Sequence, residues 1–440
     1  MKPLLIIFLA VILFAVYKLY LAYTKSQLLP GPNAERLGTQ TVNARIYHQL
    51  LLDGSPCTFK HDAFIICFEK AYRNKLQKVN GQEKEFSVTD QYTIFDLDTN
   101  LAILDKKGLQ DTKDLVKRTL DDPKPIVMTH WIETSEKGYA IRYNAYDHLT
   151  NASYDLPERA NTEYESIGEL IKDKIDKKEY THLIIACTGW NNYQDNSLET
   201  YHRWLSYIQN AANEDKRGDS FKPFFIGITW ASRWPAPAIS FFNKANDADE
   251  LGMTHICTLL WKYILPKLKN TIPVITIGHS FGARIMSRAN HSRFMHTGWD
   301  TTTHVDLAIE FQGAYSISRF CEKKGNNGGM YTVDIPVKKH FMTCSRYDHA
   351  VKQAIYTKSY IGDNKSIGRL EDNKTASLFF EFNETDSTGQ LAHPVQDKPK
   401  VLVNAENIIF RISSFLAGAH GDVSNHETGR FMWELIKKYT

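Results

Sequence analysis

The segment 275–289 limits the possible fold more than any other part of this 440-residue chain. It reads Ile-Thr-Ile-Gly-His-Ser-Phe-Gly-Ala-Arg-Ile-Met-Ser-Arg-Ala, a β-rich run that breaks into a helix-compatible stretch at Gly278-His279-Ser280-Phe281-Gly282. A strand that turns this sharply into a helix crowds the backbone around the central serine, where residues without a Cβ atom fit best. The pattern therefore predicts a nucleophile elbow, with Gly278 and Gly282 allowing the turn and the Ser280 hydroxyl exposed. The alternative is a glycine-rich turn in which the serine only caps a helix.

Charge and cysteine content argue against some classes of protein. The chain holds 53 basic and 50 acidic residues, for a net charge of +3, and no long block of one sign. This balance gives no reason to expect a nucleic-acid partner. No Cys-x-x-Cys pair occurs and several cysteines sit inside apolar runs, so we expect buried thiols rather than a disulfide framework or a zinc site. The six cysteines are Cys57, Cys67, Cys187, Cys257, Cys321 and Cys344.

The first residues differ in kind from the rest. Residues 4–17 are all apolar, and residues 19–23 continue the run beyond Lys18. The first stretch alone has the length of a signal peptide, whereas the whole run, with one lysine that can snorkel, reaches a bilayer span of about 20 residues. Because no small-x-small pair stands at a suitable cleavage position, we expect an uncleaved transmembrane anchor over residues 1–25, with a cleaved signal sequence as the alternative. Basic residues flank the run on both sides, so its orientation stays open.

Apolar runs of strand length alternate with helical stretches from about residue 125 onward. Strands are expected at 126–129, 139–143, 183–187, 224–230, 273–277, 305–311 and 340–344, and helices at 197–213, 245–268 and 281–290. This alternation predicts an α/β fold, with a mostly parallel sheet and helices on both faces. Residues 26–120 are expected to form a linker around Pro30-Gly31-Pro32 and an N-terminal extension of unknown role, which leaves residues 121–440 as the main domain.

From about residue 120 to its end, the chain resembles the α/β-hydrolase superfamily, and within it a poorly characterised lipase-like and esterase-like branch. The resemblance rests on Thr188-Gly189-Trp190-Asn191-Asn192, Thr229-Trp230, the elbow at Ser280, Ser345-Arg346-Tyr347-Asp348 and Gly418-Ala419-His420. The chain order Ser, Asp, His is that of the superfamily. The sequence departs from the branch at Thr188, where histidine is usual, and this leaves open how the loop that would hold an oxyanion is fixed. The resemblance implies an α/β-hydrolase catalytic domain over residues 121–440.

A serine hydroxyl is a weak nucleophile at neutral pH and needs an imidazole that takes its proton. Among the 16 histidines, His420 lies in a loop of small residues after the last strand-like stretch, 408–414, from which its ring could reach over the sheet edge. We therefore predict His420 as the base, with His426 as the second candidate. His279, next to the serine, is expected to point away from the site on a tight turn and to be a structural residue.

The third catalytic member must be a carboxylate that accepts a hydrogen bond from the far imidazole nitrogen and fixes its tautomer. Asp348 follows the strand predicted at 340–344, in a short polar loop at the carboxyl edge of the sheet. It is the predicted acid, although a helix cap before residues 350–356 would explain it too. Asp422 competes with it, but a residue two positions from His420 seldom reaches Nδ1 from the right side.

Acyl transfer also needs hydrogen-bond donors that face the developing oxyanion. In the α/β-hydrolase fold they are main-chain N–H groups, one from the residue after the nucleophile and one from an early strand-to-helix loop. These positions are Phe281 and Trp190 in this chain. Trp190 belongs with four other aromatic residues that either line an apolar pocket or pack in the core or a lid: Trp230, Trp234, Phe241 and Phe242.

The sequence thus predicts a membrane-associated serine hydrolase that cleaves carboxylic esters, lipid-like esters among them, through an acyl-enzyme intermediate. Its expected partners are the ester substrate and the membrane. No cofactor is implied, and no His-x-x-x-His or comparable spacing suggests a metal site. Two alternatives stay open. One is a membrane-tethered binding scaffold of the same fold without activity, and the other is a thioesterase or amidase that uses the same triad.

Overall fold

The computed structural model describes residues 9–17, 59–68, 126–135, 138–144, 158–177, 179–232, 244–245, 247–249, 251–293, 302–320, 331, 336–351, 367–369, 380–396, 398–412 and 417–440, and six short strands before residue 85. The linker expected around Pro30-Gly31-Pro32 lies outside these residues, as do Cys57 and Cys321.

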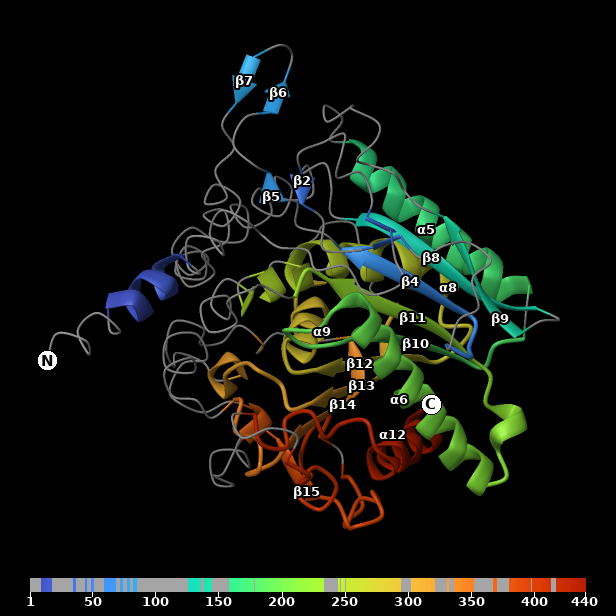
Figure 1. Ribbon diagram of the computed structural model, residues 1–440. Coiled ribbons are helices and arrows are strands. Elements are labelled where there is room, and N and C mark those ends of the chain that lie inside the picture. Colours follow the sequence, from blue (N-terminus) through green and yellow to red (C-terminus); the bar gives the residue numbers. More distant parts are fainter. Residues whose placement is uncertain are drawn as a thin grey trace, which may run out of the picture.

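A ten-stranded sheet forms the centre of the fold (Figure 1). Its strands are β4 (Ala63–Phe68), β8 (Ile126–Ser135), β9 (Gly138–Asn144), β10 (His182–Cys187), β11 (Pro223–Trp230), β12 (Val274–His279), β13 (Val305–Phe311), β14 (Val337–Cys344), β15 (Glu381–Glu384) and β16 (Lys400–Asn404). They lie in the order β15-β16-β14-β13-β12-β10-β11-β4-β8-β9. Every pairing from β15 to β4 is parallel, whereas β8 pairs antiparallel with β4, and β9 with β8. The α/β class and the mostly parallel sheet are confirmed.

The N-terminal extension contributes a strand to this sheet. β4 lies between β11 and β8 and runs parallel to β11, from Ala63 opposite Phe225 to Phe68 opposite Trp230. All six of its side chains are buried, as expected for a strand covered on both faces. A boundary at residue 120 therefore does not separate the extension from the sheet. The extension also holds three antiparallel pairs: β1 (Glu35–Arg36) with β3 (Gln49–Leu50), β2 (Ala44–Arg45) with β5 (Tyr72–Arg73), and β6 (Gln77–Val79) with β7 (Gln82–Lys84).

Helices cover both faces of the sheet, as predicted. One face carries α6 (Gln194–Glu214) and α12 (His426–Tyr439), and the other carries α5 (Glu158–Lys177), the π-helical segments η3 (Gly252–Ile256) and η4 (Leu259–Ile264), α8 (Leu265–Leu268) and α9 (Phe281–His291). Successive side chains of a strand point to opposite faces, so Ile184 of β10 packs in the α6 core while Ile185 packs in the α9 core. Short 3-10 turns complete the described elements: η2 (Gly218–Ser220), η6 (Ile317–Phe320) and η7 (Ile367–Arg369).

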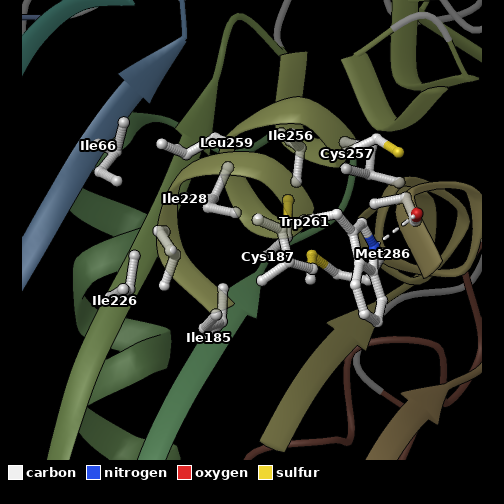
Figure 2. Packing of buried hydrophobic residues seen from close by; sticks show 14 of the residues in the cluster. Ile66, Ile185, Cys187, Ile226, Ile228, Ile256, Cys257, Leu259, Trp261 and Met286 are labelled. Carbon is white, nitrogen blue, oxygen red and sulfur yellow. Dashed lines mark hydrogen bonds between the residues drawn. The ribbon is translucent and has the colours of Figure 1, made fainter. Parts of the chain in front are cut away.

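The core on the α9 side fixes that helix against the sheet (Figure 2). Ile66, Ile185 and Ile228, from three neighbouring strands, share this core with Trp261. The indole N–H of Trp261 donates to the carbonyl oxygen of Ala289 in α9 at 3.1 Å, which satisfies the polar atom of a fully buried ring. The expectation of buried thiols is confirmed for the four cysteines that the structure describes, Cys67, Cys187, Cys257 and Cys344.

Several helices and strands were not predicted from the sequence. α5, α12, β15 and β16 were not expected, and the last strand among the described residues is β16 rather than the stretch 408–414. The described part of that stretch, 408–412, contains no strand. The N–H groups of Phe410 and Arg411 donate instead to the carboxylate of Asp422, at 3.0 and 2.8 Å. The Asp422 carboxylate therefore accepts the main-chain hydrogen bonds that a neighbouring strand would accept in a sheet.

The N-terminal apolar run is described only over residues 9–17, which are helical. Large apolar side chains of this helix are exposed, among them Leu13 and Phe14. Across the described residues, no helix has both the length and the apolar character that a membrane span requires. The rest of the expected anchor, 1–8 and 18–25, lies outside the described residues, so the anchor stays a prediction.

Candidate active site

Ser280 stands at the turn between β12 and α9 in a backbone conformation that L-residues seldom adopt. Its φ and ψ are 57° and −119°. The N–H of Ser280 donates to the carbonyl oxygen of Phe311 at 3.0 Å, and its own carbonyl oxygen accepts from the N–H groups of Arg284 and Ala314. Strain of this kind persists only where surrounding bonds impose it, and it clusters at functional sites. The strained turn expected at Ser280 is present, but the residue is buried rather than exposed.

The two glycines of the elbow are needed for steric reasons. A Cβ atom on Gly278 would lie 2.5 Å from the Cα of Ala283, and a Cβ on Gly282 would lie 2.0 Å from the carbonyl oxygen of Cys187. Both contacts are with backbone atoms, which cannot swing aside. The crowding inferred from the sequence is thus found on both sides of Ser280.

Asp348 and His420 are joined by a hydrogen bond. His420 Nδ1 lies 2.7 Å from Asp348 Oδ2, and the aspartate side chain is fully buried while the histidine side chain is 15% exposed. A carboxylate only accepts, so Nδ1 carries the proton and Nε2 is the basic nitrogen of the neutral ring. The second carboxylate oxygen, Oδ1, accepts from the N–H of Val351 at 3.2 Å. The helix that Asp348 could cap, expected at 350–356, lies outside the described residues from 352 onward, so this alternative role stays untested.

Main-chain bonds bring the loops of these two residues together. Asp348 and Gly418 form an isolated antiparallel bridge. The N–H of His349 donates to the carbonyl oxygen of Ala417 at 3.1 Å, and the N–H of Ala419 donates to that of Tyr347 at 2.9 Å. Gly418 adopts a φ of 59°, and a Cβ atom there would lie 2.3 Å from the Tyr347 oxygen. This close approach explains how residues 72 positions apart form one contact.

The competing candidates have other partners. Asp422 accepts from main-chain N–H groups and from Asn425 Nδ2 at 2.8 Å, and its role is to hold the loop before His420. His426 begins α12, is exposed, and lies 3.0 Å from Glu214 Oε1. Neither is bonded to the side chain of Ser280 or His420. The geometry therefore favours Asp348 over Asp422 as the candidate acid and His420 over His426 as the candidate base.

The expectation that His279 points away from the site is wrong. Its Nε2 lies 2.8 Å from the main-chain oxygen of His420, and the two rings are 4.8 Å apart between centroids. Burial, together with the neighbouring His420, lowers the pKa of His279 to about 3. Because His279 precedes Ser280 in the chain, this contact brings His420 beside the elbow. Among the described side chains, no hydrogen bond joins Ser280 Oγ to His420, and such bonds are often long before a substrate binds.

The loop that contains Trp190 lies directly against Ser280. A Cβ atom on Gly189 would be 2.7 Å from the Ser280 Cβ and 3.2 Å from its Oγ. Trp190 follows Gly189 and Phe281 follows Ser280, so their main-chain N–H groups belong to segments that meet at the serine, and the two rings are 6.4 Å apart. The role of these N–H groups as oxyanion donors stays a prediction.

Thr188 holds this loop in place without a histidine. Its N–H donates to the Tyr201 hydroxyl at 3.1 Å, and its hydroxyl pairs with that of Ser197 at 2.7 Å. Its carbonyl oxygen accepts from the indole N–H of Trp230 at 3.0 Å. Trp230 is therefore a buried structural residue rather than a pocket wall, whereas Trp234, Phe241 and Phe242 lie outside the described residues.

Ser232 gives the loop a further support that sequence reasoning missed. Its carbonyl oxygen accepts from the N–H of Asn191 at 3.2 Å, and its hydroxyl accepts from the N–H of Asn192 and donates to the Asn192 carbonyl oxygen. The only sequence signal is a small hydroxyl residue just after the strand that ends in Trp230.

A buried ionic cluster anchors α9 behind the serine. Asp249 accepts from Arg284 Nε at 2.7 Å and from Arg319 Nη2 at 2.8 Å, and all three side chains are buried. Burial alone would raise the pKa of Asp249, but the two guanidinium groups hold it well below its usual value. Arg319 also donates to the Tyr331 hydroxyl at 2.8 Å. Arg284 lies four residues after Ser280, so the cluster fixes the first turn of the helix.

Comparison with known protein families, with curated proteins and with solved structures finds no match for this chain. Within the described residues, no group of three or more His, Cys, Asp and Glu side chains could hold a metal ion. The assignment of the site therefore rests on its own geometry.

Proposed function

We propose that this protein is a serine hydrolase that cleaves carboxylic esters with Ser280 as nucleophile, His420 as general base and Asp348 as the acid that orients it. The observation that carries the proposal is the 2.7 Å bond between His420 Nδ1 and Asp348 Oδ2, beside a serine with a φ of 57°. A buried carboxylate on the far nitrogen of an imidazole is the arrangement that makes a histidine a directed base.

The order of the strands supports an α/β-hydrolase fold. Ser280 follows β12, Asp348 follows β14, and His420 follows β16, while Trp190 follows β10. These strands and β13 are consecutive neighbours in one parallel array, so the residues after their carboxyl ends gather at one edge of the sheet. Ligand sites of open α/β sheets lie at that edge.

The proposed reaction runs in two halves. His420 Nε2 takes the proton of Ser280 Oγ as that oxygen attacks the ester carbonyl carbon, and the N–H groups of Phe281 and Trp190 donate to the oxyanion. Collapse of the tetrahedral intermediate breaks the ester C–O bond, and His420 gives its proton to the departing alcohol. A water molecule then attacks the acyl-enzyme with His420 again as base, which releases the carboxylic acid and restores Ser280. Asp348 stays ionised throughout.

We further propose that the apolar N-terminal run attaches the protein to a membrane. The support is the sequence of residues 4–23 together with the exposed apolar side chains of the helix at residues 9–17. Exposed apolar patches mark sites that contact a membrane or another protein. Lipid-like esters are the substrates that such a location would offer.

A fluorophosphonate probe tests the proposal in the full-length protein. Covalent labelling of wild-type protein that Ser280→Ala abolishes, together with hydrolysis of p-nitrophenyl esters, is the expected result. A folded wild-type protein that neither labels nor hydrolyses esters of any chain length would instead be a binding scaffold. Thioester or amide substrates turned over faster than the matching esters would keep the triad and change the substrate class.

A further inference from the structure

His279 connects the serine elbow to the histidine loop. It is the last residue of β12, so its backbone position is set by the strand that carries Ser280. Its Nε2 lies 2.8 Å from the main-chain oxygen of His420. A carbonyl oxygen only accepts, so His279 Nε2 carries the proton and donates it.

This bond holds the histidine loop at His420 itself, on the side of the serine elbow. The loop is tied to the loop of Asp348 through Ala417, Gly418 and Ala419, all of which precede His420. The N–H of His420 itself donates within its own turn, to Ala417. On the side of Ser280, the main-chain oxygen of His420 accepts the hydrogen bond from His279. The position of the His420 ring relative to Ser280 thus depends on this bond together with the bond between Asp348 and His420 Nδ1.

The chemistry of His279 suits a permanent donor. Burial and the nearby His420 lower its pKa to about 3, so its ring stays neutral under ordinary conditions. A neutral ring keeps the same tautomer while His420 gains and loses a proton in each turnover. It also avoids a second positive charge 4.8 Å from the His420 imidazolium.

We infer that His279 is a positioning residue, which sets the distance between His420 and Ser280 by donating a hydrogen bond from the nucleophile strand to the main chain of His420. This inference rests on the proposed serine-hydrolase function. It predicts that the length and donor ability of the side chain at 279 control the chemical step and leave substrate binding unchanged.

Three variants of the full-length chain isolate this bond. His279→Leu removes the donor and puts an apolar side chain in its place. His279→Gln places an amide nitrogen near the position of Nε2, whereas His279→Asn ends nearer the position of Nδ1 and falls short of the carbonyl. Neither amide rebuilds the contact between the two rings, so a difference between Gln and Asn reports the hydrogen bond alone.

The measurements are kcat and KM for a soluble p-nitrophenyl ester, the rate of fluorophosphonate labelling, and the thermal unfolding midpoint. We expect kcat and the labelling rate to fall about 10- to 100-fold in His279→Leu and His279→Asn with KM unchanged, because a small displacement of a catalytic group has effects of that size. His279→Gln should retain wild-type kcat within about threefold on the same reasoning.

Equal rates for the Gln and Asn variants, or a loss that appears in KM rather than kcat, would overturn the positioning role. If His279→Leu fails to fold, the comparison of Gln with Asn still decides. Failure of the proposed function is recognised separately, because then wild-type protein itself does not react with the probe.

Discussion

Gly189 packs directly against Ser280, so closely that a Cβ atom at 189 would lie 2.7 Å from the Ser280 Cβ. Gly189→Ala must therefore displace the loop of Trp190 or the serine itself. We expect the displaced loop to lose one oxyanion donor, and kcat for ester hydrolysis to fall about 10²- to 10³-fold. Steady-state kinetics together with a thermal unfolding curve test this. A folded variant with wild-type kcat would show that the loop does not take part in the reaction.

Ser280→Ala and Ser280→Gly form a matched pair that separates chemistry from backbone strain. Both should lose ester hydrolysis and probe labelling, because both lack the nucleophilic oxygen. The glycine variant should be the more stable of the two by about 1 kcal/mol, since glycine adopts a φ of 57° without the steric penalty that alanine pays. Urea denaturation of the two proteins measures the difference. Greater stability of the alanine variant would mean that the turn is not strained.

Asp348→Asn and Asp422→Asn test the assignment of the acid. Asparagine at 348 can present its amide N–H₂ to His420 Nδ1 and so favour the unproductive tautomer, and the equivalent change in a serine-protease triad lowers kcat by about 10⁴. Asp422→Asn should act on stability, by about 1–3 kcal/mol, because its carboxylate accepts from the main chain before His420. Kinetics and denaturation of both variants check whether Asp348→Asn loses activity while Asp422→Asn loses stability. If Asp422→Asn proves the catalytically crippled protein, the assignment is wrong.

The ionic cluster around Asp249 should contribute strongly to the stability of the folded protein, and this contribution should depend on pH in the acid range. Asp249→Asn leaves the buried guanidinium groups of Arg284 and Arg319 without their shared carboxylate, and we expect a loss of about 3–5 kcal/mol near pH 7. The exposed residue Asp219 provides a control, and Asp219→Asn should change stability little.

The pH dependence of this loss follows from the lowered pKa of Asp249. The pKa is lower in the folded protein than its ordinary value of 3.8, so the stabilisation is complete above that value. As the pH falls below it, the unfolded chain takes up a proton first, and the stabilisation is lost progressively. The difference in unfolding free energy between wild type and Asp249→Asn should therefore shrink below about pH 4. A difference that is constant from pH 7 to pH 3 would contradict the ionic account.

Removal of residues 1–28 tests the proposed membrane attachment. The full-length protein should sediment with membranes and resist extraction by alkaline carbonate, because about 20 apolar residues are buried in lipid. The shortened protein should stay in the supernatant and keep its ester hydrolysis, since the described site residues all lie after residue 180. A mature protein that begins near residue 24 would show a cleaved signal sequence instead.

Much of the sheet could be predicted because its strands are short and buried. The runs at 183–187, 224–230 and 305–311 became β10, β11 and β13, since strands covered on both faces are continuously apolar. β4 has the same pattern, AFIICF, but it lies in a polar region, far along the chain from the other strands of the ten-stranded sheet. Nothing in the local sequence indicates that it pairs with β11. β16 is brief, and β15 is polar and lies at the sheet edge, so neither stood out.

The sequence by itself determined the turn at Ser280, because glycine spacing and the change from strand to helix act within a few residues. The tertiary structure alone decided three contacts: that of Asp348, rather than Asp422, with His420, that of His279 with His420, and that of Thr188 with Tyr201. Each of these depends on which loops meet at the carboxyl edge of the sheet. That meeting is set by the order in which strands pair, through main-chain bonds and packing between segments far apart in the chain, and such contacts leave no local pattern in the residues that make them.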